Sequence, residues 1–241
     1  RSFARECASH GQNMILVTRT GSKLHGLKEK LEKTYGVDVE IYSADLSVKE
    51  ERQKLFDYTT SNHMIVENLI NNAGFGNADA YLDTPWELHK NMVDINVVAL
   101  MHLSHLYGNE MKKRRKGRIL NVASVAAFSA GPYMSVYYAS KAFVFSLSQA
   151  MYEELKGYGV SVTALCPGPT GTNFENTAGL TNSKMFKVFG VEKADSVVKR
   201  GYKGMMRGKA IVYHSKVTYG FNIITRLVSR KCARNIAGRI N

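Results

Sequence analysis

Four side chains are of the types and at the spacings that support proton transfer: Asn96, Ser124, Tyr137 and Lys141. Tyr137 and Lys141 are four residues apart, one helical turn, so they share a helix face. Ser124 ends the apolar run 118–124, which we interpret as a buried strand. A free tyrosine, with a pKa near 10, is a poor acid or base at neutral pH, and a nearby cation stabilises its phenolate. We therefore predict that Lys141 lowers the pKa of Tyr137 and that the set exchanges a proton with a substrate oxygen.

Five short motifs resemble those of the short-chain dehydrogenase/reductase family and occur in the family's order and spacing. They are Asn-Asn-Ala-Gly at 71–74, Asp-Ile-Asn-Val at 94–97, Ser124, Tyr-Tyr-Ala-Ser-Lys at 137–141 and Cys-Pro-Gly-Pro-Thr at 166–170. Tyr-x-x-x-Lys alone matches many helices by chance, whereas five ordered motifs are specific. The resemblance covers residues 1–212 and implies an α/β fold, a Rossmann-type doubly wound parallel sheet in a single domain.

The resemblance also implies a role for each of the four side chains. Tyr137 resembles the general acid that protonates the carbonyl oxygen, and Ser124 the residue that hydrogen-bonds the same oxygen. Lys141 would hold the nicotinamide ribose, and Asn96 would anchor a water that relays protons to Lys141. Tyr138 is a competing phenol, but its neighbour one turn further on is an alanine, so Tyr137 is preferred. The alternative is an ordinary helix with an exposed Tyr–Lys pair.

One part of the family pattern is absent from the given sequence. Family members begin with a strand and a glycine-rich turn, which places the cofactor pyrophosphate on a helix N-terminus. Here residues 1–8 already have the pattern of the helix that follows this turn. The absent strand would lie in the middle of the sheet, where its loss exposes hydrogen-bonding edges. We therefore expect the natural protein to continue upstream of Arg1 by at least this strand and the glycine loop.

Apolar runs alternate with helical patterns along the chain, which favours a doubly wound parallel sheet. The predicted strands are Met14–Thr18, Val37–Tyr42, Asn68–Asn71, Arg118–Ala123, Ser161–Cys166 and Ala210–Tyr213. The predicted helices are Ser22–Tyr35, Val48–Ser61, Trp86–Lys113, Tyr137–Tyr158 and Lys193–Met206. Residues 213–241 are predicted to follow the domain as a basic amphipathic C-terminal helix.

The end of the first predicted strand bears on the choice of cofactor. An acidic residue there accepts hydrogen bonds from the ribose of NAD, whereas an arginine pairs with the 2′-phosphate of NADP. This sequence has Arg19 and no acid, which favours NADP(H), although Arg19 as a solvated loop residue is the alternative. Beside Arg19, Tyr137 and Lys141, the resemblance implies cofactor contacts from Asp45, Leu46, Asn72, Ala73, Gly74, Pro167, Gly168, Thr170 and Thr172.

Apolar residues flank the predicted catalytic set on both sides in the sequence. Beside Ser124, the predicted substrate contacts are Phe128, Met134, Phe174 and Phe186. A site with many apolar and few polar side chains suggests a hydrophobic ketone or secondary alcohol, such as a fatty-acyl or steroid-like compound. The alternative is that these side chains only pack a lid onto the domain.

The net charge of +13 is concentrated near the C-terminus. After Asp195 there are 11 basic residues and no acidic one, whereas residues 1–195 carry 22 basic and 20 acidic residues. Ile224, Val228, Cys232, Ile236 and Ile240 recur every four residues and would form one stripe of a helix, with arginines opposite. Such a helix could pack on its own domain or a second subunit, lie on anionic lipid, or bind an acidic carrier protein.

Other classes of site lack support in the sequence. Cys7, Cys166 and Cys232 have no metal-binding spacing, and their number suggests a reducing compartment. His102 and His105 lack a matching carboxylate, so we predict no metal site. The basic run 111–118 ends a helix and favours a solvated turn over a nucleic-acid surface. No run of about 18 apolar residues predicts a membrane span.

We therefore predict an NADP(H)-dependent oxidoreductase that interconverts an apolar ketone and a secondary alcohol. We expect a cytoplasmic protein with peripheral membrane contact through its C-terminal helix as one option. The resemblance implies a homodimer or homotetramer formed through the two long helices. One alternative is a 3-oxoacyl-thioester reductase of lipid metabolism. Another is a catalytically silent NADP(H)-binding regulatory protein, against which the intact Asn–Ser–Tyr–Lys set argues.

Overall fold

The structure, a computed structural model, describes residues 1–171 and 190–240, without the side chains of 239 and 240. The chain divides into two compact units, Arg1–Ile65 and Val66–Asn241. We describe each unit by itself. The predicted single domain over residues 1–212 stays a prediction.

The first unit is a two-stranded parallel sheet with three α-helices. Its elements are α1 (Ser2–Ser9), β1 (Met14–Thr18), the 3-10 helix η1 (Gly21–Leu24), α2 (His25–Tyr35), β2 (Val39–Ser43) and α3 (Lys49–Ser61). Its core joins small residues of α1 to Leu31 of α2 and Val39 of β2. β1 pairs with β2 on one side only in the part of the chain that the structure describes. β1 therefore has one unpaired edge among the described residues.

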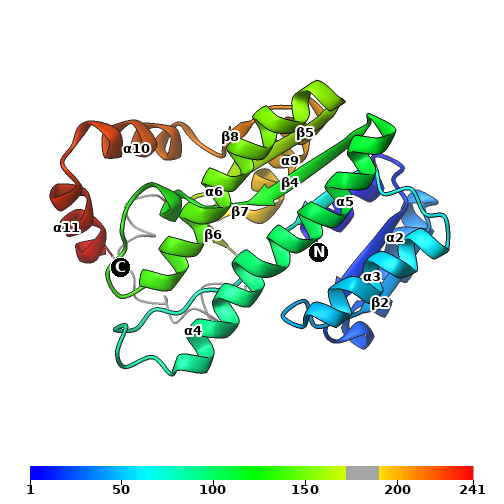
Figure 1. Cartoon of the computed structure of the whole chain (residues 1–241), viewed down its shortest axis with the longest axis horizontal. Coiled ribbons are helices and arrows are strands. Elements are labelled where there is room, and N and C mark those ends of the chain that lie inside the picture. The colour runs from blue at the N-terminus through cyan, green and yellow to red at the C-terminus, as the bar shows by residue number, and fades with distance from the viewer. Residues whose placement is uncertain (172–189, 241) are drawn as a thin grey trace. The chain divides into compact units, whose positions relative to one another are not determined.

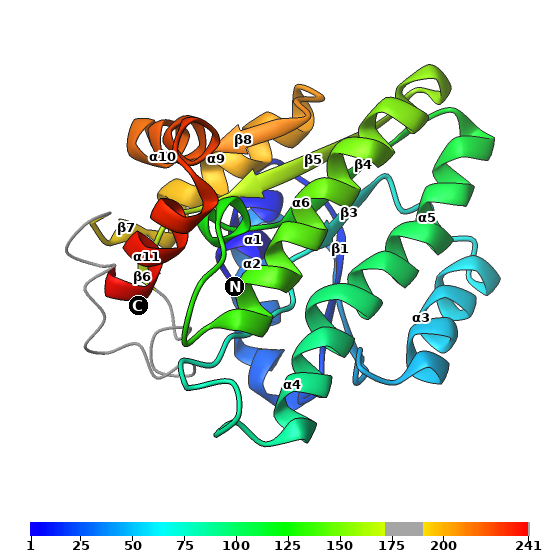
Figure 2. The same cartoon turned by 60° about the vertical axis from the view of Figure 1, so that its left-hand side comes forward.

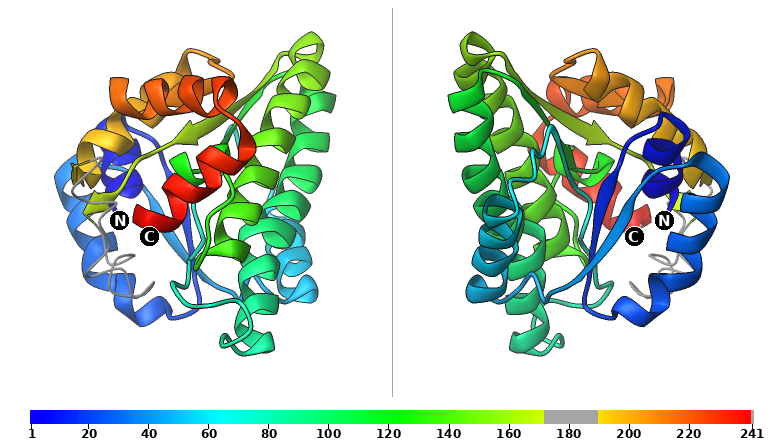
Figure 3. Two further views of the ribbon diagram at one scale, coloured as in Figure 1. Left: turned by 90° about the vertical axis from the view of Figure 1, so that its left-hand side faces the viewer. Right: turned by 90° about the vertical axis from the view of Figure 1, so that its right-hand side faces the viewer.

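The second unit contains a four-stranded parallel sheet in the order β3-β4-β5-β8. The strands are β3 (Asn68–Asn71), β4 (Gly117–Val122), β5 (Val160–Cys166) and β8 (Ile211–Tyr213). The helices between them are α4 (Trp86–Val93), the π-helix η2 (Asp94–Ala99), α5 (Leu100–Arg114), η3 (Val125–Phe128), α6 (Ser135–Leu155), η4 (Lys156–Tyr158) and α9 (Ala194–Met206). Figures 1 and 3 show α5 and α6 on one face of this sheet and α9 on the other. A short pair, β6 (Thr170–Gly171) with β7 (Glu192–Lys193), was not predicted.

Different side chains pack the helices against the two faces of this sheet. On the α9 face, glycines allow close packing, because a Cβ at Gly204 would lie 2.2 Å from Val212. On the other face, buried amides link strands to helices. Asn71 donates to both Asn121 and Ser104, and Asn121 donates to Ser148 of α6, all at 2.9–3.0 Å. Because buried polar groups need partners, this network fixes α5 and α6 against the strands.

The C-terminal segment forms two helices, so the predicted single helix is wrong. They are α10 (Lys216–Leu227) and α11 (Arg230–Ile240), which meet at a sharp bend (Figures 1 and 2). At the bend Val228 is extended, with φ −90° and ψ 156°. The Ser229 hydroxyl then accepts a hydrogen bond from the Cys232 N–H at 3.3 Å, which caps the start of a new helix. The apolar stripe predicted from Ile224 to Ile240 is therefore interrupted.

The six predicted strands agree with the observed strands β1, β2, β3, β4, β5 and β8 to within two residues at each end. Within residues 1–171 and 190–240, the chain has no helix with the length and apolar character that a membrane crossing needs.

Candidate active site

The predicted site residues lie where parallel strands end. In the second unit, Asn72–Gly74 follow β3, Ser124 follows β4 and Pro167–Thr170 follow β5. In the first unit, Arg19 follows β1 and Asp45 lies two residues after β2. Ligands of open α/β sheets bind at this carboxyl edge. The topology thus brings the residues of the second unit to one edge of its sheet.

Ser124 and Tyr137 meet, as the sequence predicts. Ser124 has an extended backbone after β4, and its hydroxyl accepts a hydrogen bond from the Ala126 N–H at 3.1 Å. The same hydroxyl hydrogen-bonds the Tyr137 side chain, which comes from the first turn of α6. The cap thereby fixes the Ser124 side chain next to the phenol.

Lys141 is buried one turn after Tyr137, with 6% of its surface exposed. Its Nζ donates a hydrogen bond to the Val122 carbonyl oxygen at 2.8 Å and lies 5.8 Å from the centroid of the Tyr137 ring. Burial disfavours the charged form and lowers the pKa of Lys141 to about 8, although the nearby Cys166 sulfur opposes this shift. The Lys141 ammonium therefore loses its proton at a pH close to the physiological range.

The predicted lowering of the Tyr137 pKa is wrong for this structure. Burial of the phenol raises its pKa to about 12, and the hydrogen bond from Ser124 only partly offsets this rise. Loss of hydration of the phenolate is the largest cause of this shift, and the Lys141 ammonium bonds a backbone carbonyl rather than the phenol. Tyr137 is therefore a neutral phenol at physiological pH, the form that can donate a proton to a substrate oxygen.

Asn96 is held in a specific orientation on the π-helix η2 and is 1% exposed. Its side-chain amide donates to the Phe75 carbonyl at 2.9 Å and accepts from the Phe75 N–H at 3.0 Å. It also donates to the Ser140 hydroxyl at 3.1 Å, and Ser140 in turn donates to the Tyr137 carbonyl at 2.7 Å. Sequence reasoning missed Ser140, although its place directly before Lys141 was a signal. The water predicted on Asn96 stays a prediction.

Gly74 leaves space between Asn96 and Lys141. A Cβ at this position would lie 2.9 Å from the Asn96 Oδ1 and 3.4 Å from the Lys141 Nζ. Any larger residue would therefore fill the region that the two side chains face. The resemblance assigns this region to the nicotinamide ribose, and the donors and acceptor present fit a sugar that carries hydroxyl groups.

The predicted adenosine contacts belong to the first unit. The Asp45 carboxylate accepts hydrogen bonds from the Ser47 N–H and hydroxyl at 2.9 and 2.7 Å. These bonds, and to a smaller extent the charge of Arg19, hold the Asp45 pKa below its usual range. Arg19 is exposed and makes no ion pair with the described residues. The Leu46 carbonyl accepts from Arg52 at 2.6 Å. Thr172 lies outside the described residues.

The predicted substrate contacts are packed inside the second unit where the structure describes them. Phe128 lies edge-on to Phe145, with ring centroids 5.2 Å apart. Met134 is 2% exposed and belongs to a cluster with Ala237 of α11, against which Tyr137 also packs. Phe174 and Phe186 lie outside the described residues. Nothing in the sequence pattern indicated that α11 packs on the segment between Ser124 and Tyr137.

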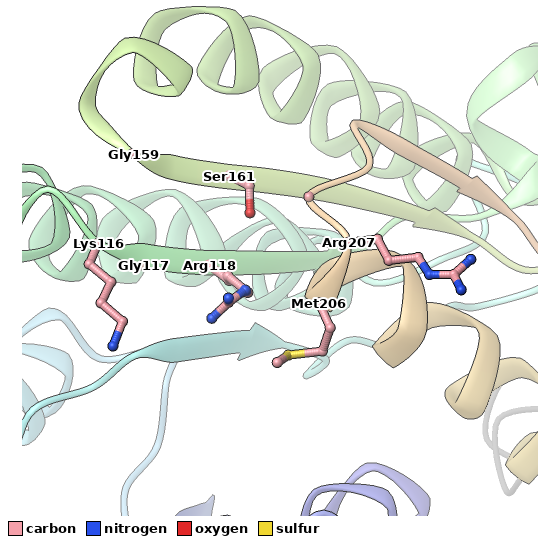
Figure 4. A pocket seen from close by; sticks show the side chains of 8 residues that line it. Lys116, Gly117, Arg118, Gly159, Ser161, Met206 and Arg207 are labelled. Atoms are coloured by element: carbon pink, nitrogen blue, oxygen red, sulfur yellow. The ribbon is translucent and has the colours of Figure 1, made fainter.

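Among the described residues, no group of three or more His, Cys, Asp and Glu side chains is arranged to hold a metal ion. A cavity of about 230 Å³ lies at the amino ends of β4 and β5, the opposite edge of the sheet (Figure 4). It is lined by Lys116, Gly117, Arg118, Gly159, Ser161, Met206, Arg207 and Gly208. Of its three cationic residues, Lys116 pairs with Glu67 at 2.6 Å and Arg207 follows the C-terminus of α9, so these two have local roles.

The sequence profile described as short chain dehydrogenase matches residues 1–180. The chain is 32% identical over 208 residues to 17-beta-hydroxysteroid dehydrogenase type 3 of Mus musculus, covering 84% of this chain and 64% of that protein. It is 30% identical over 172 residues to a 7beta-hydroxysteroid dehydrogenase of Collinsella aerofaciens, covering 71% and 65%. A very-long-chain 3-oxoacyl-CoA reductase of Anas platyrhynchos is 29% identical, with 69% and 54% covered. The chain thus spans less than two thirds of the length of these curated relatives.

Solved structures match the fold over almost the whole chain. A short-chain dehydrogenase from Sphingobium yanoikuyae in complex with NADPH superimposes with a TM-score of 0.83 at 27% identity, covering 94% of this chain and 88% of that one. A 7beta-hydroxysteroid dehydrogenase superimposes with a TM-score of 0.86 at 23% identity, covering 98% and 91%. These matches confirm the predicted Rossmann-type α/β fold.

Proposed function

Because this chain belongs to the short-chain dehydrogenase family, we propose that it is an NADP(H)-dependent oxidoreductase that interconverts an apolar ketone and a secondary alcohol. The observation that carries the proposal is the hydrogen bond between Ser124 and Tyr137, with Lys141 buried one turn away. A protein that only bound the nucleotide would have no need of a phenol positioned in this way.

The residues divide the proton chemistry among them. Ser124 orients the substrate carbonyl, and the neutral phenol of Tyr137 donates its proton to the carbonyl oxygen as negative charge develops there. Lys141, held by the Val122 carbonyl, and Asn96, held by Phe75, fix the space beside Gly74 where the ribose would bind. The cofactor would supply the hydride that reaches the carbonyl carbon. Oxidation of the alcohol requires the reverse proton transfer, to a Tyr137 phenolate.

Arg19 supports NADP(H) rather than NAD(H). It is exposed directly after β1 and its charge already acts on Asp45, so a phosphate on the adenosine ribose would find an arginine without an ion-pair partner among the described residues. One solved relative holds NADPH. The test compares KM for NADPH and NADH in the wild type, in Arg19→Ala and in the control Arg5→Ala on α1. We expect Arg19→Ala to raise KM for NADPH about tenfold, the effect of losing about 1.4 kcal/mol, and Arg5→Ala to leave it unchanged. Equal KM values for both cofactors in the wild type contradict the assignment.

The names of the relatives support an apolar substrate. Two are hydroxysteroid dehydrogenases and one is a very-long-chain 3-oxoacyl-CoA reductase. The last favours a second candidate function, reduction of a 3-oxoacyl thioester. NADPH consumption should therefore be followed over steroid ketones, other apolar ketones and 3-oxoacyl thioesters, with Tyr137→Phe as the control. Binding of NADPH without any turnover would favour a regulatory protein instead.

We further propose a cytoplasmic homodimer or homotetramer that uses α5 and the helix α6. These two helices lie side by side on one face of the second unit's sheet (Figures 1 and 3), and α5 exposes Met101 and α6 Phe143 at 42% and 40%. Analytical sedimentation of the wild type and of Phe143→Glu measures the oligomeric state. A monomeric wild type contradicts the proposed oligomer.

A further inference from the structure

The helix α10 has its polar and apolar faces inverted. Its buried residues, Thr218 and Asn222, are polar and only 1% and 4% exposed. Both are satisfied inside the unit, since Thr218 bonds the capping Ser215 and Asn222 donates to the Tyr213 hydroxyl at 2.7 Å. The apolar side chains point the other way, and Leu227 is 80% exposed. A surface helix that packs only on its own domain shows the opposite pattern, with its apolar residues buried and its polar residues exposed.

Five large apolar side chains are exposed on α10. Besides Leu227 it contains Val217, Tyr219, Ile223 and Ile224, which are 53%, 52%, 36% and 54% exposed. At 100° per residue these side chains fall on one side of the helix, and Thr218 and Asn222 fall on the other. Exposed apolar side chains gathered on one side of a helix are typical of an interaction site.

Basic residues border this apolar face, and no acidic residue accompanies them. Among the described side chains, the exposed cations on α10 and α11 are Lys216, Arg226, Arg230, Lys231 and Arg234. Asp195 is the last acidic residue of the sequence. A second copy of the chain bound face to face would therefore bring like charges together, which opposes self-association. A binding partner that complements this face should therefore be apolar where it meets the apolar side chains and anionic where it meets the basic ones.

The second helix of this segment connects it to the candidate active site. Ala237 of α11 is 1% exposed and packs with Ala126, Met134 and Tyr138. Gly238 lies close to Pro132, because a Cβ at Gly238 would be 3.1 Å from the proline ring. Ala126, Pro132 and Met134 lie in the segment between Ser124 and Tyr137, and Tyr138 directly follows it. α11 thus joins the exposed face of α10 to the residues beside the phenol.

We propose that α10 and α11 dock the protein on an anionic lipid bilayer. The apolar face of α10 enters the boundary between headgroups and acyl chains, and the basic side chains bind the anionic headgroups. Resting on the proposed function, the docking places the catalytic set next to the phase in which an apolar ketone dissolves. The site therefore takes its substrate from the bilayer.

Co-sedimentation with vesicles tests the docking directly. We expect the wild type to bind phosphatidylcholine vesicles that contain phosphatidylserine at low salt, and to bind pure phosphatidylcholine vesicles at least tenfold less. Leu227→Glu should lower binding at least tenfold. The matched control is Leu82→Glu, a leucine that is 91% exposed but lies outside α10 and α11, and it should bind like the wild type. Circular dichroism confirms that both variants are folded.

Three results would overturn the docking. One is the absence of vesicle binding, and another is equal binding by the wild type and Leu227→Glu. The third is a lipid-free dimer that Leu227→Glu converts to monomer, which would assign the face to a second copy. Turnover measurements separate this proposal from the proposed function. Leu227→Glu should reduce ketones that partition into vesicles more slowly than the wild type does, and it should reduce water-soluble ketones at the same rate. A wild type that binds vesicles but reduces no ketone would contradict the proposed reductase activity and leave the docking standing.

Discussion

The buried ammonium of Lys141 should cost the protein stability at neutral pH. The folded pKa of Lys141 is about 8, whereas the unfolded value is 10.5. Because the unfolded chain binds this proton more tightly, the free energy of unfolding rises with pH between these two values. At 1.4 kcal/mol per tenfold change in proton affinity, the penalty is about 3 kcal/mol at pH 7 and falls to about 2 kcal/mol at pH 9.

Replacement of Lys141 by methionine removes this titration while keeping an unbranched apolar side chain in the site. Between pH 7 and pH 9, the free energy of unfolding of the wild type should rise by about 1 kcal/mol more than that of Lys141→Met. Cys166 and Tyr137, which also titrate abnormally, are present in both proteins and largely cancel in the difference. The variant should also lose activity.

Urea unfolding followed by circular dichroism measures the free energy of unfolding of the wild type and of Lys141→Met, each at pH 7 and at pH 9. Trp86 fluorescence is a second probe of the same transition. The control is Lys90→Met, since Lys90 is exposed and pairs with Asp94 on the surface of its helix. Its pH dependence should follow the wild type. Parallel pH dependences for the wild type and Lys141→Met would refute the claim that burial depresses the pKa of Lys141.

Further predictions concern the phenol, the pH profile and the amide network. Tyr137→Phe should lower kcat for ketone reduction about 10²–10⁴-fold while NADPH binding, measured by fluorescence, is retained; a loss of less than tenfold contradicts its role as the acid. For reduction, kcat/KM should be level below pH 8 and decline above it as Lys141 loses its proton, while Tyr137 stays protonated up to pH 12; a decline on the acid side of pH 8 argues against this order. Asn121→Ala removes one buried hydrogen bond from Asn71 and one from Ser148, so the free energy of unfolding in urea should fall by about 1–3 kcal/mol, and no loss would mean that water replaces the amide.

Regular elements and the catalytic set could be predicted from the sequence because local patterns determine them. The strands of the second unit are short apolar runs bounded by glycine, polar turns or proline, and they came out within two residues. Ser124 and Tyr137 could be brought together because one ends a strand and the other starts the next long helix. The carboxyl ends of parallel strands then place both at one edge.

The errors concern properties that depend on three-dimensional surroundings. The spacing of Lys141 and Tyr137 shows their proximity, but it does not show that Val122 offers a carbonyl to the ammonium. Desolvation of the phenol is likewise invisible in the spacing, so the direction of its pKa shift was mistaken. At the C-terminus, a stripe every four residues concealed the Ser229 cap, which competes with helix continuation at Val228.

The π-helix η2 makes the region around Asn96 sensitive to chain length. A wide turn accommodates one residue more than an α-helical turn, so the residues on either side of it are out of phase with a continuous α-helix. Deleting a single residue between 94 and 99 would let the segment relax to a continuous α-helix, which would keep α4 and α5 in phase but remove the wide turn that carries Asn96. The amide that grips both backbone groups of Phe75 would then face elsewhere, so this stretch should tolerate substitution far better than any deletion.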